Sequence, residues 1–140
     1  MRIAVDVMGG DHGCAVVIGG VKLALQADPR ITSLLLVGQE DKIRPALAAT
    51  GLNDRRTQIV HASEVLTMDD SPVEGIRRKK DSSMVRAIDL VRDAKADAVI
   101  SPGNTGALVA GSMKLRRLEG VERPAITVRM PSRTGDFVLL

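Results

Sequence analysis

The sequence predicts a doubly wound α/β fold, in which a mostly parallel sheet carries helices on both faces. Short apolar runs at residues 3–8 and 34–37 have the composition of strands that are buried on both sides. Segments with helical spacing of apolar residues alternate with these runs, as expected for β-α-β units. Small-residue turns at 9–13 and 101–106 follow two of the strands. Together these features predict one α/β domain over residues 1–140, with its ligand site beyond the carboxyl ends of the strands.

The first part of the chain supplies three strands and two helices in alternation. Each apolar run is closed by glycine, proline or a polar residue, which sets the expected boundaries. In order, the elements are a strand at 3–8, a helix whose apolar face lies within 16–25 and which ends near Asp28, a strand at 34–37, a helix at 40–50 that Gly51 ends, and a strand at 58–61.

A strong helix start follows the loop at 64–71. Ser71 is the expected N-cap, Pro72 the first helical residue, and Glu74 the second member of a capping box. This helix ends in the basic run 77–80, which complements the negative end of a helix dipole.

The last part of the chain begins with another helix, which opens at 81–83 and has apolar residues at helical spacing. Its start lies beside the lysines of the preceding basic run, so it is a second candidate anion site. The remaining predicted elements are a strand at 96–100, a helix that carries Leu108, Leu115 and Leu118 and stops at Gly120, and strands at 124–128 and 136–140.

Composition excludes several classes of protein. The chain is 44% hydrophobic and 26% charged, which is typical of a folded globular domain. A net charge of +3 does not require nucleic acid, and Phe137 is the one aromatic residue, which argues against base stacking. The single cysteine, Cys14, rules out an internal disulfide, and with the absence of a signal-peptide pattern it favours a cytoplasmic location.

The turn at 101–106 carries the clearest chemical signal. A strand, a tight turn and a helix start leave several backbone N–H groups unpaired at the positive end of the helix dipole, where a phosphate can bind. Asn104 and Thr105 can add side-chain donors, while Gly103 and Gly106 allow the backbone to approach a ligand closely. The turn alone supports a phosphate site and a plain helix cap equally.

Polar residues near the first strand form a second group of candidates. Asp6 interrupts a buried strand, and bonds to nearby loop N–H groups explain it somewhat better than a role in a site. Asp11 is a possible cap of the next helix, and with His12 it places a carboxylate beside a titratable ring. Cys14, at the start of that helix, is better explained as a small buried hydrophobe than as a reactive thiol.

Three stretches taken together resemble one family. They are residues 8–13, 78–84 and 101–108, and their order and spacing resemble the phosphate acyltransferases of bacterial phospholipid synthesis, the PlsX type. The resemblance runs over the whole chain, including residues 120–124. It implies a fold similar to that of phosphotransacetylases and isocitrate-type dehydrogenases.

The resemblance also implies an activity and its partners. The expected reaction moves a fatty acyl group from acyl carrier protein to inorganic phosphate and gives acyl phosphate. The expected enzyme is a cytoplasmic homodimer that associates with the membrane surface and uses no organic cofactor. We assign no metal ligands and expect no nucleic-acid partner.

Site residues follow from the motifs. The turn that starts at Ser101 is expected to hold phosphate, while Lys80, Ser82 and Ser83 supply charge and orientation. Asp11 and His12 are expected to position substrate or to shuttle a proton. The candidate catalytic residues are Asp11, His12, Lys80 and Asn104, and the candidate phosphate- or substrate-binding residues are Gly9, Gly10, Lys79, Ser82, Ser83, Ser101, Gly103, Thr105 and Gly106.

The chain departs from the family pattern in two ways. Pro102 stands where the family usually has alanine and removes one backbone donor from the turn, and Cys14 stands where proline is usual. Family members are also more than twice as long. We therefore expect an N-terminal portion or a truncated product, which by itself is inactive and self-associates.

Two alternative functions remain open. One is another enzyme on the same scaffold, such as a phosphotransacetylase or a nucleotide-using dehydrogenase. The other is non-catalytic: the chain binds a phospho-ligand, or pairs with another chain through its last apolar strand.

Overall fold

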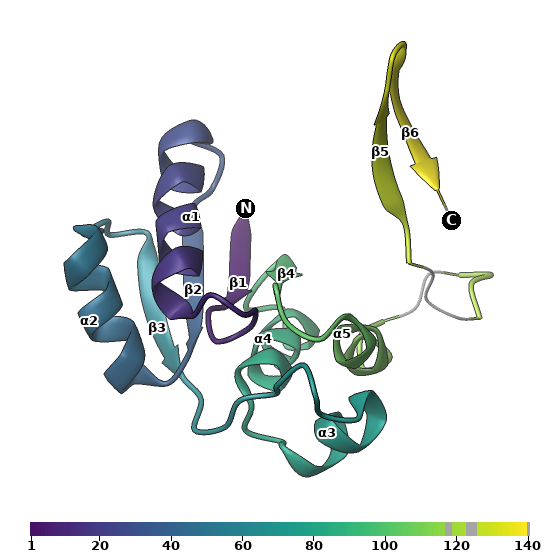
Figure 1. Ribbon diagram of the computed structural model, residues 1–140, viewed down its shortest axis with the longest axis horizontal. Coiled ribbons are helices and arrows are strands. Elements are labelled where there is room, and N and C mark those ends of the chain that lie inside the picture. Colours follow the sequence, from purple (N-terminus) through teal and green to yellow (C-terminus); the bar gives the residue numbers. More distant parts are fainter. Residues whose placement is uncertain (117–118, 123–125, 140) are drawn as a thin grey trace.

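Apolar runs form the strands of an α/β body, and a β-hairpin extends from it (Figure 1). This computed structural model describes residues 1–116, 119–122 and 126–139. The elements are β1 (Arg2–Asp6), α1 (Cys14–Ala27), β2 (Ser33–Gly38), α2 (Glu40–Thr50), β3 (Thr57–His61), α3 (Pro72–Arg78), α4 (Ser83–Arg92), β4 (Ala98–Ile100), α5 (Thr105–Ser112), β5 (Val128–Ser132) and β6 (Gly135–Leu139).

Four strands form a parallel sheet in the order β3-β2-β1-β4. β1 lies inside the sheet, where Val5 is opposite Leu36 of β2 and Ile100 of β4. The chain moves from β1 outward to β3 and then returns to β4 on the other side of β1. This reversal confirms the predicted doubly wound class, and it places the switch point at the carboxyl ends of β1 and β4.

Alternation along the strands divides the core into layers. Ile3 and Val5 pack with α1 and α2, whereas Ala4 between them packs on the opposite face with α4. A further cluster joins α3, α4 and α5 through Ile76, Ile88 and Ala107. Helices therefore cover both faces, as predicted. None of the described helices combines the length and the apolar character that crossing a membrane would require.

Of the predicted helix caps, one is confirmed in position and one is wrong. Ser71 is the N-cap of α3 and Pro72 its first residue, as predicted, but the capping box is absent, since the Ser71 side chain makes no cap hydrogen bond and Glu74 pairs with Arg77. Gly13 rather than Asp11 is the N-cap of α1. Its φ of 77° lies in the left-handed region, which glycine adopts without the steric cost that a Cβ would add.

Several predicted boundaries also differ from the structure, three of them in the last part of the chain. β4 is shorter than predicted because Asp97 instead accepts hydrogen bonds from the Arg2 backbone and guanidinium. β5 begins only at Val128, where pairing with Leu139 of β6 begins. α5 ends at Ser112, whose hydroxyl bonds to the Val109 carbonyl oxygen at 2.7 Å. The predicted helix residue Leu118, strand residues 124 and 125, and Leu140 lie outside the described residues.

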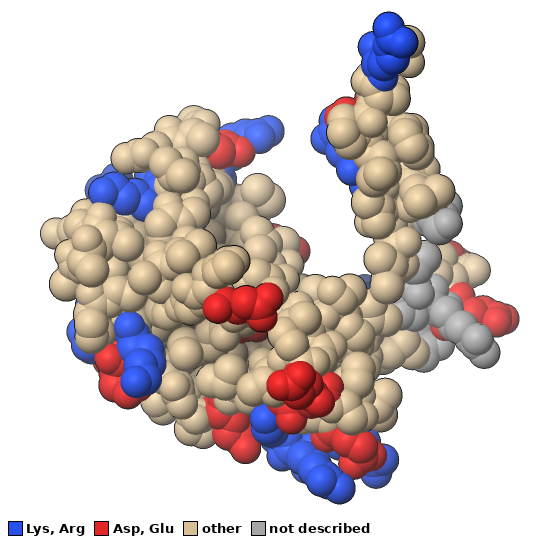
Figure 2. Space-filling view, in the orientation of Figure 1, with Lys and Arg blue, Asp and Glu red and all other residues tan. Residues whose placement is uncertain are grey.

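β5 and β6 form an antiparallel hairpin that stands apart from the α/β body (Figure 1). Met130 pairs with Phe137 across the hairpin, and every residue of the two strands is exposed. In the space-filling view the hairpin surface is mainly uncharged, with a cationic group at its tip (Figure 2). The predicted last strand is thus confirmed, but its partner is β5 and it takes no place in the parallel sheet.

The layered core predicts a contrast between two leucines. Leu36 of β2 is fully buried, whereas Leu23 of α1 is 67% exposed. We expect Leu36→Ala to lower the free energy of unfolding by about 2–5 kcal/mol through lost contacts and a cavity. Leu23→Ala should change it by no more than about 0.5 kcal/mol. Urea denaturation followed by circular dichroism measures both, and equal effects would contradict this assignment of the core.

Candidate functional site

The buried carboxylate of Asp6 joins the two strands that flank the switch point. Asp6 is 2% exposed, and its Oδ1 accepts the Met8 N–H at 3.1 Å. Its Oδ2 accepts the hydroxyl of Ser101 at 2.7 Å, immediately after β4. The Ser101 Oγ in turn accepts the Gly103 N–H at 3.1 Å. The Ser101 proton and the Gly103 N–H are therefore both used within the protein, and neither is left for an anion.

The loop after β1 and the turn after β4 pack backbone against backbone. A Cβ on Gly9 would lie 2.7 Å from the Gly103 nitrogen, so no larger residue fits there without a backbone shift. Gly10 has a φ of 82° and lies over Pro102. These glycines bring the two candidate segments together, as the sequence predicts for residues at one edge of the sheet.

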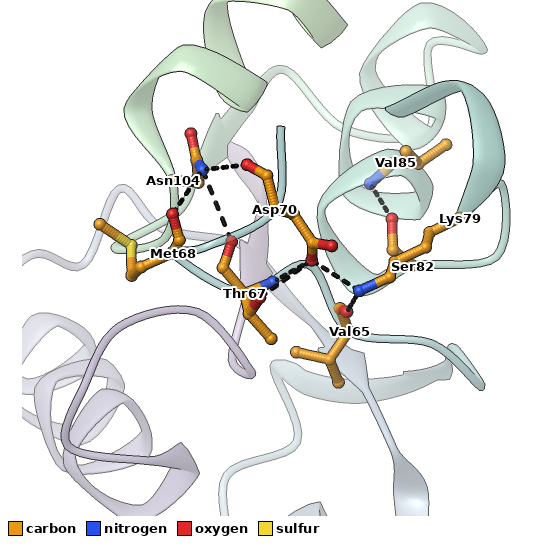
Figure 3. Close-up of polar contacts among 8 residues, drawn as sticks. All are labelled: Val65, Thr67, Met68, Asp70, Lys79, Ser82, Val85 and Asn104. Carbon is orange, nitrogen blue, oxygen red and sulfur yellow. Dashed lines mark hydrogen bonds and ion pairs between the residues drawn. The ribbon is translucent and has the colours of Figure 1, made fainter. Parts of the chain in front are cut away.

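Asn104 is the N-cap of α5 and also holds the loop at 65–70. Its Oδ1 accepts the Ala107 N–H at 2.9 Å. Its Nδ2 donates to the carbonyl oxygens of Met68 at 3.2 Å and Asp70 at 3.1 Å (Figure 3). With the residue only 7% exposed, the amide is fully engaged. In this structure the Asn104 amide holds the turn and the loop together, and its catalytic role stays a prediction.

The start of α5 leaves three backbone donors open. The N–H groups of Asn104, Thr105 and Gly106 have no hydrogen-bond partner among the described residues. Thr105 and Gly106 are both exposed. A Cβ on Gly106 would lie 2.8 Å from the Pro72 Cγ, so this helix start sits directly against the start of α3. The structure thus leaves these amides open, whereas the Ser101 and Asn104 side chains of the turn are engaged within the protein.

A cavity of about 250 Å³ lies between the loop after β1 and the loop at 65–69. Gly10 and Asp11 line one side, and Asp69 lies on the other. Two carboxylates and no Lys or Arg line this space, which disfavours a phosphate dianion inside it. His12 is exposed and is not part of the lining.

Lys79 is paired with a carboxylate that belongs to the same loop. Its ammonium contacts the Asp70 Oδ2 at 2.5 Å and donates to the Val65 carbonyl oxygen at 3.0 Å (Figure 3). The hydrogen bond from Lys79, together with the Thr67 N–H, lowers the pKa of the Asp70 carboxyl to about 2. Lys79 thus fixes the loop at 65–70, and the Asp70 carboxylate compensates its positive charge.

Lys80 lies in a different place from the turn. It lines a separate cavity with Arg77, Asp89 and Lys114, and that cavity shares no residue with the one beside Asp11. The structure therefore supplies no contact that would bring the Lys80 ammonium to the turn.

The start of α4 adjoins the turn on the side that faces the protein interior. The Met84 Cε would lie 3.2 Å from a Cβ on Gly103, and Ser82 and Ser83 are buried. Ser82 caps its own helix by accepting the Val85 N–H at 3.5 Å (Figure 3). Both candidate segments thus meet in one region, although the two predicted hydroxyls face the protein interior.

Several features of this region were not singled out from the sequence. Asp70 and Thr67 shape the loop that faces the turn, and their only sequence signal was an acidic stretch in an otherwise irregular segment.

Cys14 is half-buried against the core, and burial raises the pKa of its thiol, in line with the predicted hydrophobic role. Among the described residues no three His, Cys, Asp or Glu side chains gather as a metal site would require.

Comparison with known proteins adds a family context. A family model described as "Fatty acid synthesis protein" matches residues 1–140. The chain is 46% identical to a phosphate acyltransferase of Exiguobacterium sp. (strain ATCC BAA-1283 / AT1b), with 100% of this chain and 42% of the relative covered. It is 48% identical to a phosphate acyltransferase of Legionella pneumophila (strain Paris), with 96% and 40% covered. The chain thus spans about two fifths of the length of the curated relatives it matches.

The Asp70–Lys79 pair predicts a pH-dependent contribution to stability. Its carboxyl titrates at about pH 2 when folded and near pH 3.9 in an unfolded chain. The contribution is therefore fully present above about pH 4 and is lost as the pH falls toward 2. We expect Asp70→Asn to be less stable at pH 7 and to lose less stability on acidification, measured by urea denaturation between pH 7 and 2.

Asp69→Asn is the matched control for this experiment. Asp69 is the exposed neighbour in the same loop and makes no hydrogen bond among the described residues. Its substitution should leave the acid dependence of the parent chain unchanged. If Asp70→Asn also keeps the parent acid dependence, the ion pair does not stabilise the fold.

Proposed function

The chain belongs to the family of fatty acid synthesis proteins, and from this membership we propose that it forms part of an enzyme that transfers a fatty acyl group to inorganic phosphate. The proposed acyl donor is a thioester of acyl carrier protein, and the proposed product is an acyl phosphate used in phospholipid synthesis. Relatives named phosphate acyltransferase support this proposal, because they match the chain from end to end.

One observation of the structure carries the proposal. The start of α5 presents the unpaired N–H groups of Thr105 and Gly106 at the switch point of the sheet, beside the glycine loop after β1. Ligands of doubly wound sheets bind at this position. Unpaired amides at the positive end of a helix dipole favour an anion over a neutral ligand. Phosphate is the substrate whose chemistry suits this helix start.

The proposed step needs positioning more than acid–base chemistry. A phosphate oxygen attacks the thioester carbonyl carbon, a C–O bond forms, and the C–S bond breaks to release the thiolate. A thiol has a pKa of about 8.5, so the thiolate leaves without a strong general acid. Holding phosphate at a fixed distance from the carbonyl lowers the entropic part of the barrier. A rigid turn with open amides supplies that placement.

The remaining candidate residues take supporting roles in this proposal. Asp11 and His12 lie in the exposed loop after β1, where they are placed to orient the acyl donor or move a proton. Asn104 keeps the start of α5 in position. Lys80 lines a separate cavity, so we assign it no contact with phosphate. In this proposal it only adds positive potential to the neighbouring surface.

Partners and location extend the same proposal. We place the enzyme in the cytoplasm, as a homodimer with access to the membrane surface. The exposed hairpin supports self-association, since Phe137 and Val138 are 50% and 64% exposed on strands with free edges. The proposed reaction requires no organic cofactor.

A second candidate function is phospho-ligand binding without turnover by this chain alone. It is favoured by the side chains of the turn, because the Ser101 hydroxyl and the Asn104 amide are both engaged within the protein, which leaves backbone amides for binding a ligand. Turnover of an acyl carrier protein thioester in the presence of phosphate, followed by phosphorus NMR, separates the two functions. Acyl phosphate formation by the chain would exclude the second candidate.

The phosphate-binding role of the turn is tested by removing one backbone donor. Proline is well tolerated at the first residue of a helix, and Asn104 before it already has the extended backbone that proline requires. We therefore expect Thr105→Pro to fold normally. Since a hydrogen bond to a charged group contributes about 1.5–3 kcal/mol, its affinity for phosphate should fall roughly tenfold or more.

Thr105→Val is the control, because it keeps the N–H and removes only the hydroxyl. Isothermal titration with inorganic phosphate should give an affinity close to that of the parent chain. Equal affinity of the parent chain and Thr105→Pro would remove this amide from the site, and no binding to any of the three chains would overturn the phosphate-binding role.

A further inference from the structure

The helix α1 is apolar on nearly all of its surface. Lys22 is the one charged residue among its 14 residues. One side of the helix packs against the sheet through Ile18 and Leu25. On its outer side, however, Val16 is 60% and Leu23 is 67% exposed. Since a helix that is apolar all round is normally buried, α1 has more apolar surface than the sheet alone covers.

An apolar groove of about 450 Å³ continues from α1 to the edge of the sheet beside β4. Val16 and Ala24 of α1 line it, together with Val5 of β1 and Ile100 of β4, and every lining residue is aliphatic, glycine or proline. Ile100 is 52% exposed. The core layer formed with α1 and α2 contains no residue of β4. Parallel sheets are normally covered on both faces, and among the described residues this face is covered only as far as β1.

The strand β4 is also a free edge of the sheet, with β1 as its one neighbour among the described strands. The Asp97 N–H donates to the β1 backbone, and N–H groups alternate in direction along a strand, so those of Ala98 and Ile100 point away from β1. At the opposite edge, β3 carries Gln58 and His61, whereas β4 consists of alanine, valine and isoleucine. An apolar, uncharged edge of this kind favours pairing with a further strand.

The comparisons indicate where such a strand comes from. The whole chain matches 42% of the Exiguobacterium phosphate acyltransferase, so about three fifths of that relative lie outside the match. A further parallel strand needs a crossover connection, usually a helix, which a continuous polypeptide supplies. Two copies related by a two-fold axis would instead pair β4 with β4 in the antiparallel direction and supply no crossover helix. The hairpin is not the occupant, since it stands apart from the body (Figure 1).

We propose that the groove and the edge of β4 form the docking surface for the part of the family's enzyme that this chain does not cover. A helix of that part fills the groove, and the strand connected to it pairs with β4. Docking thus extends the sheet beside the candidate site, since Ile100 and Pro102 flank Ser101. The proposal rests on family membership and not on the proposed reaction, so absence of phosphate binding would overturn the proposed function and leave this surface assigned.

Two valines are a matched pair for the test. Val16 of α1 and Val73 of α3 both lie in the first turn of a helix, and they are 60% and 56% exposed. Val16 lines the groove, whereas Val73 does not. In the 140-residue chain, Val16→Glu and Val73→Glu should each leave the thermal unfolding midpoint within about 3 °C, because surface substitutions have small effects.

The same variants are then measured in a hybrid, in which this chain replaces the matched part of the Exiguobacterium relative. There Val16→Glu places a carboxylate in an apolar interface, so the midpoint should fall by at least about 5 °C, whereas Val73→Glu should leave it unchanged. Hydrogen exchange followed by NMR is a second readout. The amides of Ala98 and Ile100 should exchange at least about a hundredfold more slowly in the hybrid than in the 140-residue chain.

Co-expression of the two parts as separate chains is the second route if the hybrid does not fold. The tagged 140-residue chain should retain the uncovered part of the relative through purification, and Val16→Glu should lower the amount retained at least tenfold. Unchanged exchange of the β4 amides in a folded hybrid would overturn the proposal, as would failure of both hybrid folding and co-purification.

Two other occupants are recognised by their own results. Loss of self-association of the 140-residue chain in Val16→Glu, but not in Val73→Glu, would make a second copy the occupant. Protection of the α1 and β4 amides in the hybrid only after palmitate is added would make a lipid the occupant. Either result overturns the proposal.

Discussion

A buried carboxylate at the end of β1 holds the candidate site together. An ionised carboxylate is costly to remove from water unless donors replace the lost hydration. Asp6 finds them in the Met8 N–H and the Ser101 hydroxyl, which lie after β1 and after β4. Because the two strands are parallel neighbours, a residue at the end of one reaches the first residue after the other. The contact of Gly9 with Gly103 and the direction of α5 both depend on this link.

A second set of polar contacts fixes the loop at 65–70 against the same turn. Asn104 holds two carbonyl oxygens of the loop, while Lys79 holds Asp70 and so lowers the pKa of that carboxyl. In both cases a side chain that could have contacted a ligand instead positions the backbone. The donors left at the surface are therefore the α5 amides, which both sets of contacts hold in position.

The sequence predicts the sheet well because buried strands such as 34–37 consist of apolar residues only, which is a local signal. It also predicts that the segments at 9–13 and 101–106 meet, since parallel strands present their carboxyl ends at one edge. Side-chain roles were harder to predict. Asn104 and Lys79 have local patterns typical of donors to an anion, but their partners lie in a loop whose path no periodicity specifies.

The scarcity of cations around the turn suits phosphate in the proposed role of nucleophile. Where phosphate is attacked, as in phosphoryl transfer, cations neutralise its oxygens and favour the reaction. Where phosphate attacks, a tightly paired ammonium would withdraw charge from the oxygen that must form the new bond. Amide donors at a helix start hold the dianion through partial charges and leave an attacking oxygen free. Lys79, already neutralised by Asp70, and Lys80, in a separate cavity, are consistent with that requirement.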